Sequence, residues 1–429
     1  MQRYRQTYKP NNIDSFKKKL LQWANQYSHV CFLESNTRHQ LQKNVVDEYD
    51  SILAVGLYSG FESNNKNAFQ KLQHFLNNTN DWIFGNLCYD LKNEIENLDS
   101  KNSDNLFFEN IYFFQPEYVF IQNGNTFQLQ SMHQHQQLFE AIEALTIEDF
   151  SVSEKVELIP RLNEKEYSIT FDKIKDQIQA GNIYEMNFCF EFYADNVSIS
   201  PLDVWFKLNE LSHAPMSCFY KLNDKFIISA TPERFLKKKN QKVIAQPIKG
   251  TAKRSSNQNE DDLIKQSLAK NMKEQTENIM IVDLVRNDLS RLAKARSVKV
   301  DELFGVYTFK QVHQLISTIS CDVDASITVS EIIKQNFPMG SMTGAPKVSA
   351  MQLIEAFEST KRGAYSGSVG YFNPNGDFDF NVIIRSLLYN QQNKYLSYSV
   401  GSAITNAANA NEEYNECLLK AKVIKSLFN

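Results

Sequence analysis

Paired cysteines are missing from this sequence. Its six cysteines stand singly, and none belongs to a C-x-x-C pair; they are Cys31, Cys88, Cys189, Cys218, Cys321 and Cys417. Zinc modules and disulfide-stapled secreted domains need such pairs, so the sequence predicts neither kind of site. Because their neighbours are apolar or aromatic, we expect reduced thiols in the core of a cytoplasmic protein.

Long hydrophobic runs and a strong net charge are also missing. No apolar run is long enough to cross a bilayer, and residues 1–10 lack the apolar centre of a signal peptide, so no membrane association is expected. The net charge of −4, from 46 basic and 50 acidic residues, gives no general footprint for nucleic acid. With 42% apolar and 22% charged residues, the composition is typical of a globular protein.

Strand-like and helix-like segments alternate along the 429 residues, which favours an α/β (α+β) fold with two lobes. The predicted N-terminal lobe, residues 1–155, contains short apolar runs at 30–33, 52–56 and 110–114. Between residues 151 and 162 the charge rises and Pro160 interrupts the pattern. Residues 164–429 form the predicted second domain.

The second domain opens with a clear helix pattern, because apolar residues recur at 167, 171, 174 and 178. Strands are predicted over 186–193, 217–220, 226–229 and 242–246, and helices over 348–357 and from about 409. A further strand, 382–386, is predicted to end near Arg385. A long helix after Asn259 is predicted to carry an apolar stripe formed by Leu263, Ile264, Leu268 and Met272.

Lys249 has an unusual sequence setting, between Ile248 and Gly250 in the segment Pro247–Thr251. A lysine on an apolar wall loses hydration, which lowers its pKa and makes its amine a usable nucleophile. The glycine beside it allows backbone to approach a ligand closely.

Two helices each carry a Glu-x-x-Glu pair, Glu274 with Glu277 and Glu413 with Glu416. This spacing places both carboxylates of a pair on one helix face. If the two faces meet, four carboxylates converge on a site suited to Mg²⁺, which prefers oxygen ligands. From the spacing alone, surface ion pairs are the favoured interpretation, because lysines lie four residues from Glu277 and Glu416.

Other segments allow both a functional and a structural interpretation. The glycine- and hydroxyl-rich turn 337–347 leads into a helix, where free N–H groups could bind an anion or the turn could be purely structural. Arg385 could grip a substrate carboxylate or form a salt bridge at a sheet edge. His313 fits a satisfied core histidine better on its local sequence. Gly401–Ile404 could bring backbone N–H groups to a ligand or be an ordinary strand-end turn.

Taken together, these motifs resemble the chorismate-utilising enzymes in order and spacing. The resemblance is dense over residues 164–429 and faint before 150, where 82–90 is similar to a family segment; the motifs are 247–251, 277–289, 337–347, 362–367 and 401–404. It implies a two-lobed fold with large β-sheets packed as a sandwich and helices on the outside.

The resemblance also implies roles for individual residues. Mg²⁺ is the implied cofactor, with Glu277 and Glu416 as direct ligands and Glu274 and Glu413 acting through water. Glu233 matches the acid that protonates the leaving 4-hydroxyl group. The implied substrate-binding residues are Gly250, Thr251, His313, Ser341, Tyr365, Arg385, Gly401, Ser402, Ala403 and Lys420. Ser341 replaces the usual threonine, and Ala403 replaces the usual glycine.

Lys249 is similar to the catalytic lysine of the aminodeoxychorismate-forming branch, whereas anthranilate synthases carry alanine there. The implied reaction converts chorismate and ammonia to 4-amino-4-deoxychorismate, for p-aminobenzoate and folate synthesis, through attack of Lys249 at C2. The alternatives are an anthranilate synthase and a catalytically silent chorismate-binding protein.

Two further expectations concern ammonia. Glu185 stands where amide-bearing relatives usually have glutamine, so its effect on the choice of ammonia over water is open. The chain has no Gly-x-Cys-x-Gly nucleophile elbow. The implied ammonia source is therefore a separate glutamine amidotransferase subunit, with free ammonia as a substitute.

Overall fold

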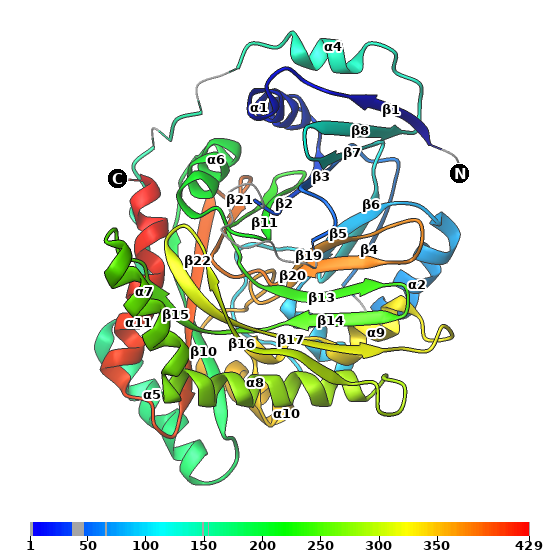
Figure 1. Cartoon of the computed structure of the whole chain (residues 1–429). Coiled ribbons are helices and arrows are strands. Elements are labelled where there is room, and N and C mark those ends of the chain that lie inside the picture. Colours follow the sequence, from blue (N-terminus) through cyan, green and yellow to red (C-terminus); the bar gives the residue numbers. More distant parts are fainter. Residues whose placement is uncertain (1–2, 37–46, 65–66, 148–149, 153, 429) are drawn as a thin grey trace.

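The computed structural model describes residues 3–36, 47–64, 67–147, 150–152 and 154–428, and two antiparallel sheets organise them (Figure 1). The first sheet runs in the order β1 (Tyr4–Tyr8), β8 (Thr126–Ser131), β7 (Tyr118–Asn123), β3 (Ser51–Val55), β2 (His29–Glu34), β11 (Ser217–Leu222), β12 (Lys225–Ser229), β21 (Ser386–Asn390), β22 (Tyr395–Thr405), β10 (Glu185–Ala194) and β18 (Gly344–Ala345), with β9 (Ile159–Pro160) also paired to β10.

The second sheet carries the predicted nucleophile on its edge strand. Its order is β15 (Ile248–Lys253), β17 (Val312–Asp322), β14 (Lys242–Gln246), β13 (Arg234–Lys239), β20 (Phe378–Asn381), β19 (Ser368–Phe372), β5 (Ile83–Leu87), β6 (Ile111–Gln115) and β4 (Ser59–Ser63), with β16 (Lys299–Thr308) paired to β17. Each sheet contains strands from both predicted domains. In the first sheet β2 pairs with β11, and in the second β5 pairs with β19. The boundary between 1–155 and 164–429 stays a prediction, and both sheets extend across it.

Helices cover the outer faces of the sheets (Figure 1). They are α1 (Ile13–Ala24), α2 (Ala68–Thr79), α3 (Lys92–Ile95), α4 (Leu138–Glu143), α5 (Glu164–Gln179), α6 (Pro201–Ser212), α7 (Gln258–Lys270), α8 (Met272–Ser290), α9 (Val329–Asn336), α10 (Lys347–Phe357) and α11 (Ala410–Lys425), with short 3-10 turns η2 (Tyr89–Leu91), η3 (Gly340–Met342) and η4 (Ser426–Phe428).

Alternation along the strands divides the interior into two cores. On β3, Leu53 and Val55 pack into a core shared with α1, α5, α6 and α11, whereas Ile52 and Ala54 face the strands of the second sheet. Side chains on a strand point alternately to opposite faces, so one strand contributes to both cores. The expected sandwich with outer helices is confirmed. All six cysteines are free and buried, as expected.

Local sequence patterns predicted most elements near the site. Helix α5 begins after Asn163, which forms a reciprocal capping box with Glu166. The predictions of β10, the β11–β12 hairpin, β14, α10 and α11 are also confirmed.

Three local predictions were wrong. The helix after Asn259 is two helices separated at Asn271, and it is capped by Asn257. Within its apolar stripe Leu268 is buried, whereas Leu263 is 65% and Met272 73% exposed. Residues 382–385 are an irregular connection rather than a strand, and Gly401–Ile404 lies inside β22 rather than at its end.

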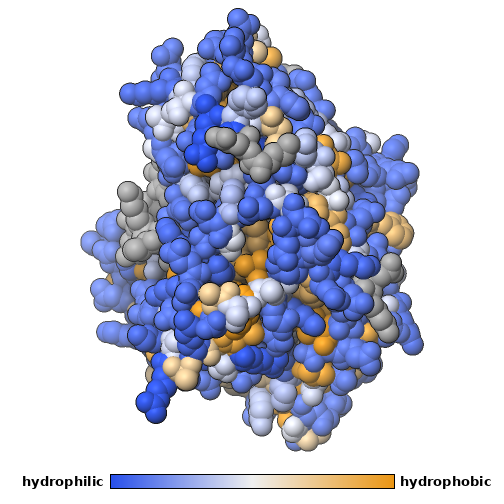
Figure 2. Space-filling model, turned by 90° about the vertical axis from the view of Figure 1, so that its right-hand side faces the viewer, coloured by the Kyte–Doolittle hydropathy of each residue, from blue (hydrophilic) through white to orange (hydrophobic). Residues whose placement is uncertain are grey.

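One face of the molecule is mainly hydrophilic (Figure 2). Figure 2 shows this face, on which polar side chains dominate, with apolar side chains gathered mostly in the hollows near its middle. In the part of the chain that the structure describes, none of the helices has the length and apolarity needed to cross a membrane.

Candidate active site

Lys249 joins the two sheets through an ion pair. It lies on edge strand β15, and its Nζ is 3.0 Å from Oε1 of Glu185, the first residue of β10 in the other sheet. The Lys249 side chain is 12% exposed and that of Glu185 only 2%. Asn278 of α8 donates a hydrogen bond to the backbone carbonyl of Lys249, which fixes the strand beneath the side chain.

The pKa of Lys249 is raised, whereas the sequence predicted a lowered pKa. Burial alone would lower the pKa of Lys249, but the carboxylates of Glu185, Glu277 and Glu416 raise it above its usual value. The expected apolar wall is therefore wrong: in the protein without ligands this amine is an ammonium. Sequence neighbours suggested apolar surroundings because the three carboxylates come from distant segments.

Glu233 has the protonation behaviour expected of a general acid. It precedes β13, is 4% exposed and accepts a 2.6 Å hydrogen bond from Oγ of Ser341. Burial raises the pKa of Glu233 to about 7, although Ser341, Lys249 and Arg385 act in the opposite direction. A carboxyl group that titrates near neutrality can donate a proton under ordinary conditions.

The two predicted carboxylate pairs face each other across α8 and α11. Burial and neighbouring carboxylates raise the pKa values of Glu274, Glu277 and Glu413. Burial would also raise the pKa of Glu416, but the ammonium of Lys420, 2.7 Å away, holds it below its usual value. A second ion pair, from Lys273 to Glu413, crosses from one helix to the other at 3.4 Å.

The fit of these carboxylates to a metal ion is partial. Their oxygen chemistry suits a hard dication, and their mutual repulsion would be relieved by one. Within the described segments, however, no group of three or more acidic, histidine or cysteine side chains lies close enough to hold a metal ion. The predicted surface ion pair between Glu416 and Lys420 is present. The carboxylates would therefore have to move closer together to enclose an ion.

Two glycines bring backbone close to the predicted pocket. Gly250 has φ +96°, and a Cβ there would lie 3.1 Å from Oε2 of Glu274. A Cβ on Gly401 would lie 2.4 Å from Sγ of Cys189, so only glycine permits this approach of β22 to β10. The Gly401 carbonyl accepts a 2.8 Å hydrogen bond from Lys420. Ala403 pairs with Asn187 on the same two strands.

Arg385 and Tyr365 come from irregular segments around β19–β21. Arg385 adopts a left-handed conformation with φ 51°, and Glu233 and Glu416 are the carboxylates that act on its charge. No side-chain hydrogen bond or ion pair joins its guanidinium to another described residue, so it can take a carboxylate from a ligand. The buried Tyr365 hydroxyl lies 3.6 Å from Sγ of Cys189.

Three predicted substrate residues already have protein partners. His313 is buried, with Nε2 3.0 Å from Asp261 and Nδ1 2.9 Å from Thr308. This is the arrangement of a satisfied core histidine, and its substrate role stays a prediction. The Ser402 hydroxyl meets Tyr167 at 3.0 Å, and the exposed Thr251 hydroxyl accepts from Gln314 at 3.4 Å.

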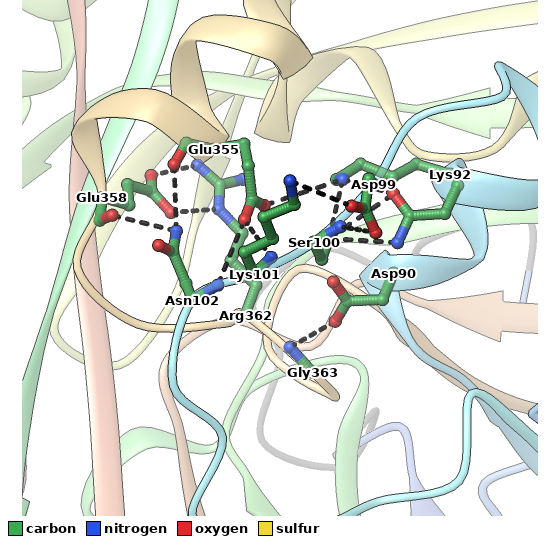
Figure 3. Close-up of polar contacts among 11 residues, drawn as sticks. Asp90, Lys92, Asp99, Ser100, Lys101, Asn102, Glu355, Glu358, Arg362 and Gly363 are labelled. Carbon is green, nitrogen blue, oxygen red and sulfur yellow. Dashed lines mark hydrogen bonds and ion pairs between the residues drawn. The ribbon is translucent and has the colours of Figure 1, made fainter.

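Figure 3 shows the polar network around the buried pair Arg362 and Glu358. Arg362 pairs with Glu358 at 2.6 Å and donates to the backbone carbonyls of Asn187 and Met342 at 2.9 and 2.6 Å. The side-chain amide of Asn102 donates to the carbonyl of Glu358, which attaches the 99–102 loop to the same network. Arg362 thus connects β10 with the turn that carries Ser341.

Sequence reasoning missed the partners that determine protonation and support. Glu185 was noted only as a departure from the family pattern, and its contact with Lys249 was not predicted. The roles of Asn278 and of the Arg362–Glu358 pair were also missed. The i, i+4 spacing of Glu358 and Arg362 could have suggested their ion pair, but no local pattern indicates the cross-sheet contact of Glu185.

The chain matches a family model described as chorismate binding enzyme over residues 28–426. Aminodeoxychorismate synthase component 1 of Escherichia coli (strain K12) is 36% identical over 281 residues, which cover 65% of this chain and 61% of that protein. The protein of the same name from Bacillus subtilis (strain 168) is 29% identical over 353 residues, covering 79% and 74%. The matched region thus spans less than two thirds of the Escherichia coli relative.

Solved structures with the same fold include two enzymes that are named for other activities. Anthranilate synthase component I from Streptococcus pneumoniae TIGR4 superposes with a TM-score of 0.79 at 23% identity, covering 90% of this chain and 94% of that one. The menaquinone-specific isochorismate synthase from Escherichia coli gives 0.76 at 14% identity, covering 100% and 95%. At these identities the likeness shows the fold, and the expected fold class is confirmed. Because the family model spans nearly the whole chain, this protein belongs to the chorismate binding enzyme family.

Proposed function

We propose that this protein converts chorismate and ammonia to 4-amino-4-deoxychorismate, as an aminodeoxychorismate synthase component I. The observation that carries the proposal is Lys249, held between the two sheets with a carboxylate at 3.0 Å. The relatives named above include aminodeoxychorismate synthases that match this chain at 36% and 29% identity. An anthranilate synthase is the competing assignment, and its active site does not need this lysine.

The first step requires Lys249 to lose its proton. Glu185 is the base in contact with the ammonium, so the proton passes from Nζ to the carboxylate along their hydrogen bond. The neutral amine then attacks C2 of chorismate. Glu233 donates its proton to the 4-hydroxyl group, which leaves as water. In the second step ammonia adds at C4, the bond between Lys249 and C2 breaks, and the lysine regains a proton.

Substrate binding is assigned to residues around Arg385, whose guanidinium has no hydrogen bond or ion pair with another described residue. Arg385, with Tyr365 near the same segment, would hold the enolpyruvyl carboxylate. Gly250, Gly401 and Ala403 would form the pocket floor. Ser341 keeps Glu233 in place through its hydrogen bond.

Magnesium is part of the proposal. Glu277 and Glu416 would hold it directly and Glu274 and Glu413 through water, and it would neutralise the ring carboxylate of chorismate. Lys273 and Lys420 now pair with two of these carboxylates and would exchange partners when the ion is bound. Glu277→Gln is expected to lose Mg²⁺-dependent turnover.

The proposed setting is a cytoplasmic pathway to p-aminobenzoate and folate. A glutamine amidotransferase subunit would supply ammonia, which agrees with the designation component 1 of the relatives. Ammonium salts are expected to replace that subunit in the assay.

Mass spectrometry of the protein with chorismate, Mg²⁺ and no ammonia tests the chemistry. The expected result is an adduct on Lys249 equal to chorismate minus water, absent from Lys249→Ala. With ammonium and an added aminodeoxychorismate lyase, p-aminobenzoate should appear. Anthranilate formed without the lyase, and no adduct, would show that the assignment is wrong.

A further inference from the structure

A small cavity beside the proposed general acid has about 20 Å³ of space for water, which is enough to hold a water molecule. Apolar side chains from β13, β14 and α8 form much of its wall, among them Leu236, Ala245 and Val285. Besides Arg234, which is paired with Asp379 and Asp47, its polar lining falls into two groups, Glu233 with Ser341 and Asp288 with Asn336. The second group lies outside the proposed substrate site and has no role in the chemistry described above.

Asp288 is an incompletely satisfied charge in this wall. It lies near the end of α8, is 3% exposed, and accepts a 2.9 Å hydrogen bond through Oδ2 from Lys347. Its other oxygen, Oδ1, is buried and has no hydrogen-bond partner among the residues with described positions. Leaving a buried carboxylate oxygen unpaired is costly, so such a group usually binds an ordered water.

Lys347 fixes Asp288 in this position. Its ammonium also donates to the Asn336 carbonyl at 3.3 Å, which links the cavity wall to the end of α9. The other charges that act on Asp288 are those of Arg291 and Glu96. On the opposite group, Glu233 faces Ser341, Lys249 and Arg385.

After Glu233 has protonated the leaving 4-hydroxyl group, it must regain a proton before the next turnover. Ser341 occupies Oε1 of Glu233 as a donor, and within the described parts of the chain no side chain donates to Oε2. During the proposed reaction the front of Glu233 is covered by substrate. A proton that returns from that side would have to pass the bound intermediate, whereas the cavity also reaches Glu233 and, apart from Ser341, is lined by none of the residues assigned to substrate binding.

We propose that water in this cavity connects Glu233 to Asp288 and returns a proton to Glu233 after each turnover, with Asp288 as the positioning residue. This inference rests on the general-acid role of Glu233 proposed above. An O–H bond of a cavity water breaks as the new O–H bond forms on the Glu233 carboxylate, and the water regains a proton from solvent. The charge of Asp288 stabilises the positive charge while the proton is in transit, and Oδ1 holds the water in place.

Two variants test the proposal in different ways. Asp288→Asn keeps the shape of the side chain and removes its charge, whereas Ala245→Leu fills part of the cavity with apolar atoms and displaces water. Each is expected to lower kcat roughly tenfold, a fraction of what general acid catalysis contributes, with KM for chorismate unchanged. Because proton return becomes slow, the solvent deuterium isotope effect on kcat should increase in both. Unchanged kcat and isotope effect in Ala245→Leu would overturn the proposal even if Asp288→Asn does not fold.

Controls separate this proposal from the function on which it rests. Asp283→Asn, an exposed aspartate of the same helix paired with Arg286, should behave as the unmodified protein. If Glu233→Gln loses activity while both cavity variants keep it, only the proton path is wrong. If Glu233→Gln stays active, the general-acid role fails and this inference fails with it. A crystal structure should show water bonded to Oδ1 of Asp288, and a dry cavity would contradict the proposal.

Discussion

At the residue scale, the pKa values of Glu233 and Lys249 are both raised, by different causes. Glu233 is partly protonated at neutral pH because burial penalises its carboxylate and raises its pKa to about 7. Lys249 stays protonated because carboxylates surround it. Glu233 can therefore donate a proton in the free protein. Lys249 can attack only after Glu185 takes its proton or a cation neutralises the surrounding carboxylates.

Ser341 is predicted to control the alkaline limit of activity. The protonated form of Glu233 predominates below its pKa, so turnover should fall as the pH rises above about 7. The Ser341 hydroxyl stabilises the carboxylate and lowers this pKa. Ser341→Ala should therefore move the fall in kcat to higher pH. A pH–rate profile measures the shift, with Ser320→Ala, a buried hydroxyl bonded to Asp301, as the control.

Glu185→Gln is predicted to lower the pKa of Lys249, because the nearest carboxylate becomes neutral. Only the unprotonated amine reacts with an acylating reagent, so Lys249 should be labelled at lower pH in the variant. Peptide mass spectrometry across a pH series measures this, with the exposed Lys253 as an internal reference. Identical labelling curves for Lys249 in both proteins would contradict the assigned role of Glu185.

At the scale of elements, the pocket floor depends on how closely β22 approaches β10. A Cβ at position 401 would also meet Oδ1 of Asn187 and the Phe188 carbonyl at 2.8 Å. Long helices surround this pair of strands, so the strands cannot separate without disturbing the outer core. The same closeness explains why the segment is a strand interior and not a turn.

Gly401→Ala should destabilise the protein by about 1–3 kcal/mol, the usual cost of adding atoms to a packed site. It should also weaken chorismate binding, because β22 must shift. Ala403→Gly makes the opposite exchange two residues away and should cost only about 0.5–1 kcal/mol. Urea unfolding and chorismate titration measure both effects. Equal stability of Gly401→Ala and the unmodified protein would show that the strands have room to adjust.

At the scale of the whole molecule, the Arg362–Glu358 pair connects segments far apart in the sequence. The Arg362 guanidinium lies 4.6 Å from the ring of Tyr89, on η2, and Asp90 accepts a hydrogen bond from the Gly363 amide at 3.0 Å. Together with the carbonyls of Asn187 and Met342, these contacts tie an early segment to both walls of the site. Both side chains of the ion pair are about 96–97% buried, since their exposures are 3% and 4%.

Arg362→Met should destabilise the protein by about 3–5 kcal/mol, because it leaves the Glu358 carboxylate buried without its partner. The double variant Arg362→Met/Glu358→Leu should be less destabilised, since no unpaired charge remains. Arg286→Met, which removes an exposed ion pair with Asp283, should change stability by no more than about 1 kcal/mol. Urea unfolding decides among these, and equal losses for Arg362→Met and Arg286→Met would contradict the buried-charge argument.

Much of the fold could be predicted because its cues are local. The capping box at Asn163, the 3.6-residue repeat of α5 and the turn at Asn223 each act within a few residues. The failures also have local causes. Leu263 and Met272 belong to one apolar pattern but lie on separate helices divided at Asn271, and Arg385 follows an apolar run that does not continue the sheet.

The sequence by itself determined the family, the positions of most strands and helices, and the residue types available for chemistry, because these depend on short-range order and spacing. Only the tertiary structure decided how those residues are charged and which of them meet. Lys249 and Glu185 are 64 residues apart, and Glu233 and Ser341 are 108 apart. Their pKa values depend on burial and on charges brought close by sheet pairing, and neither quantity is present in the order of the residues.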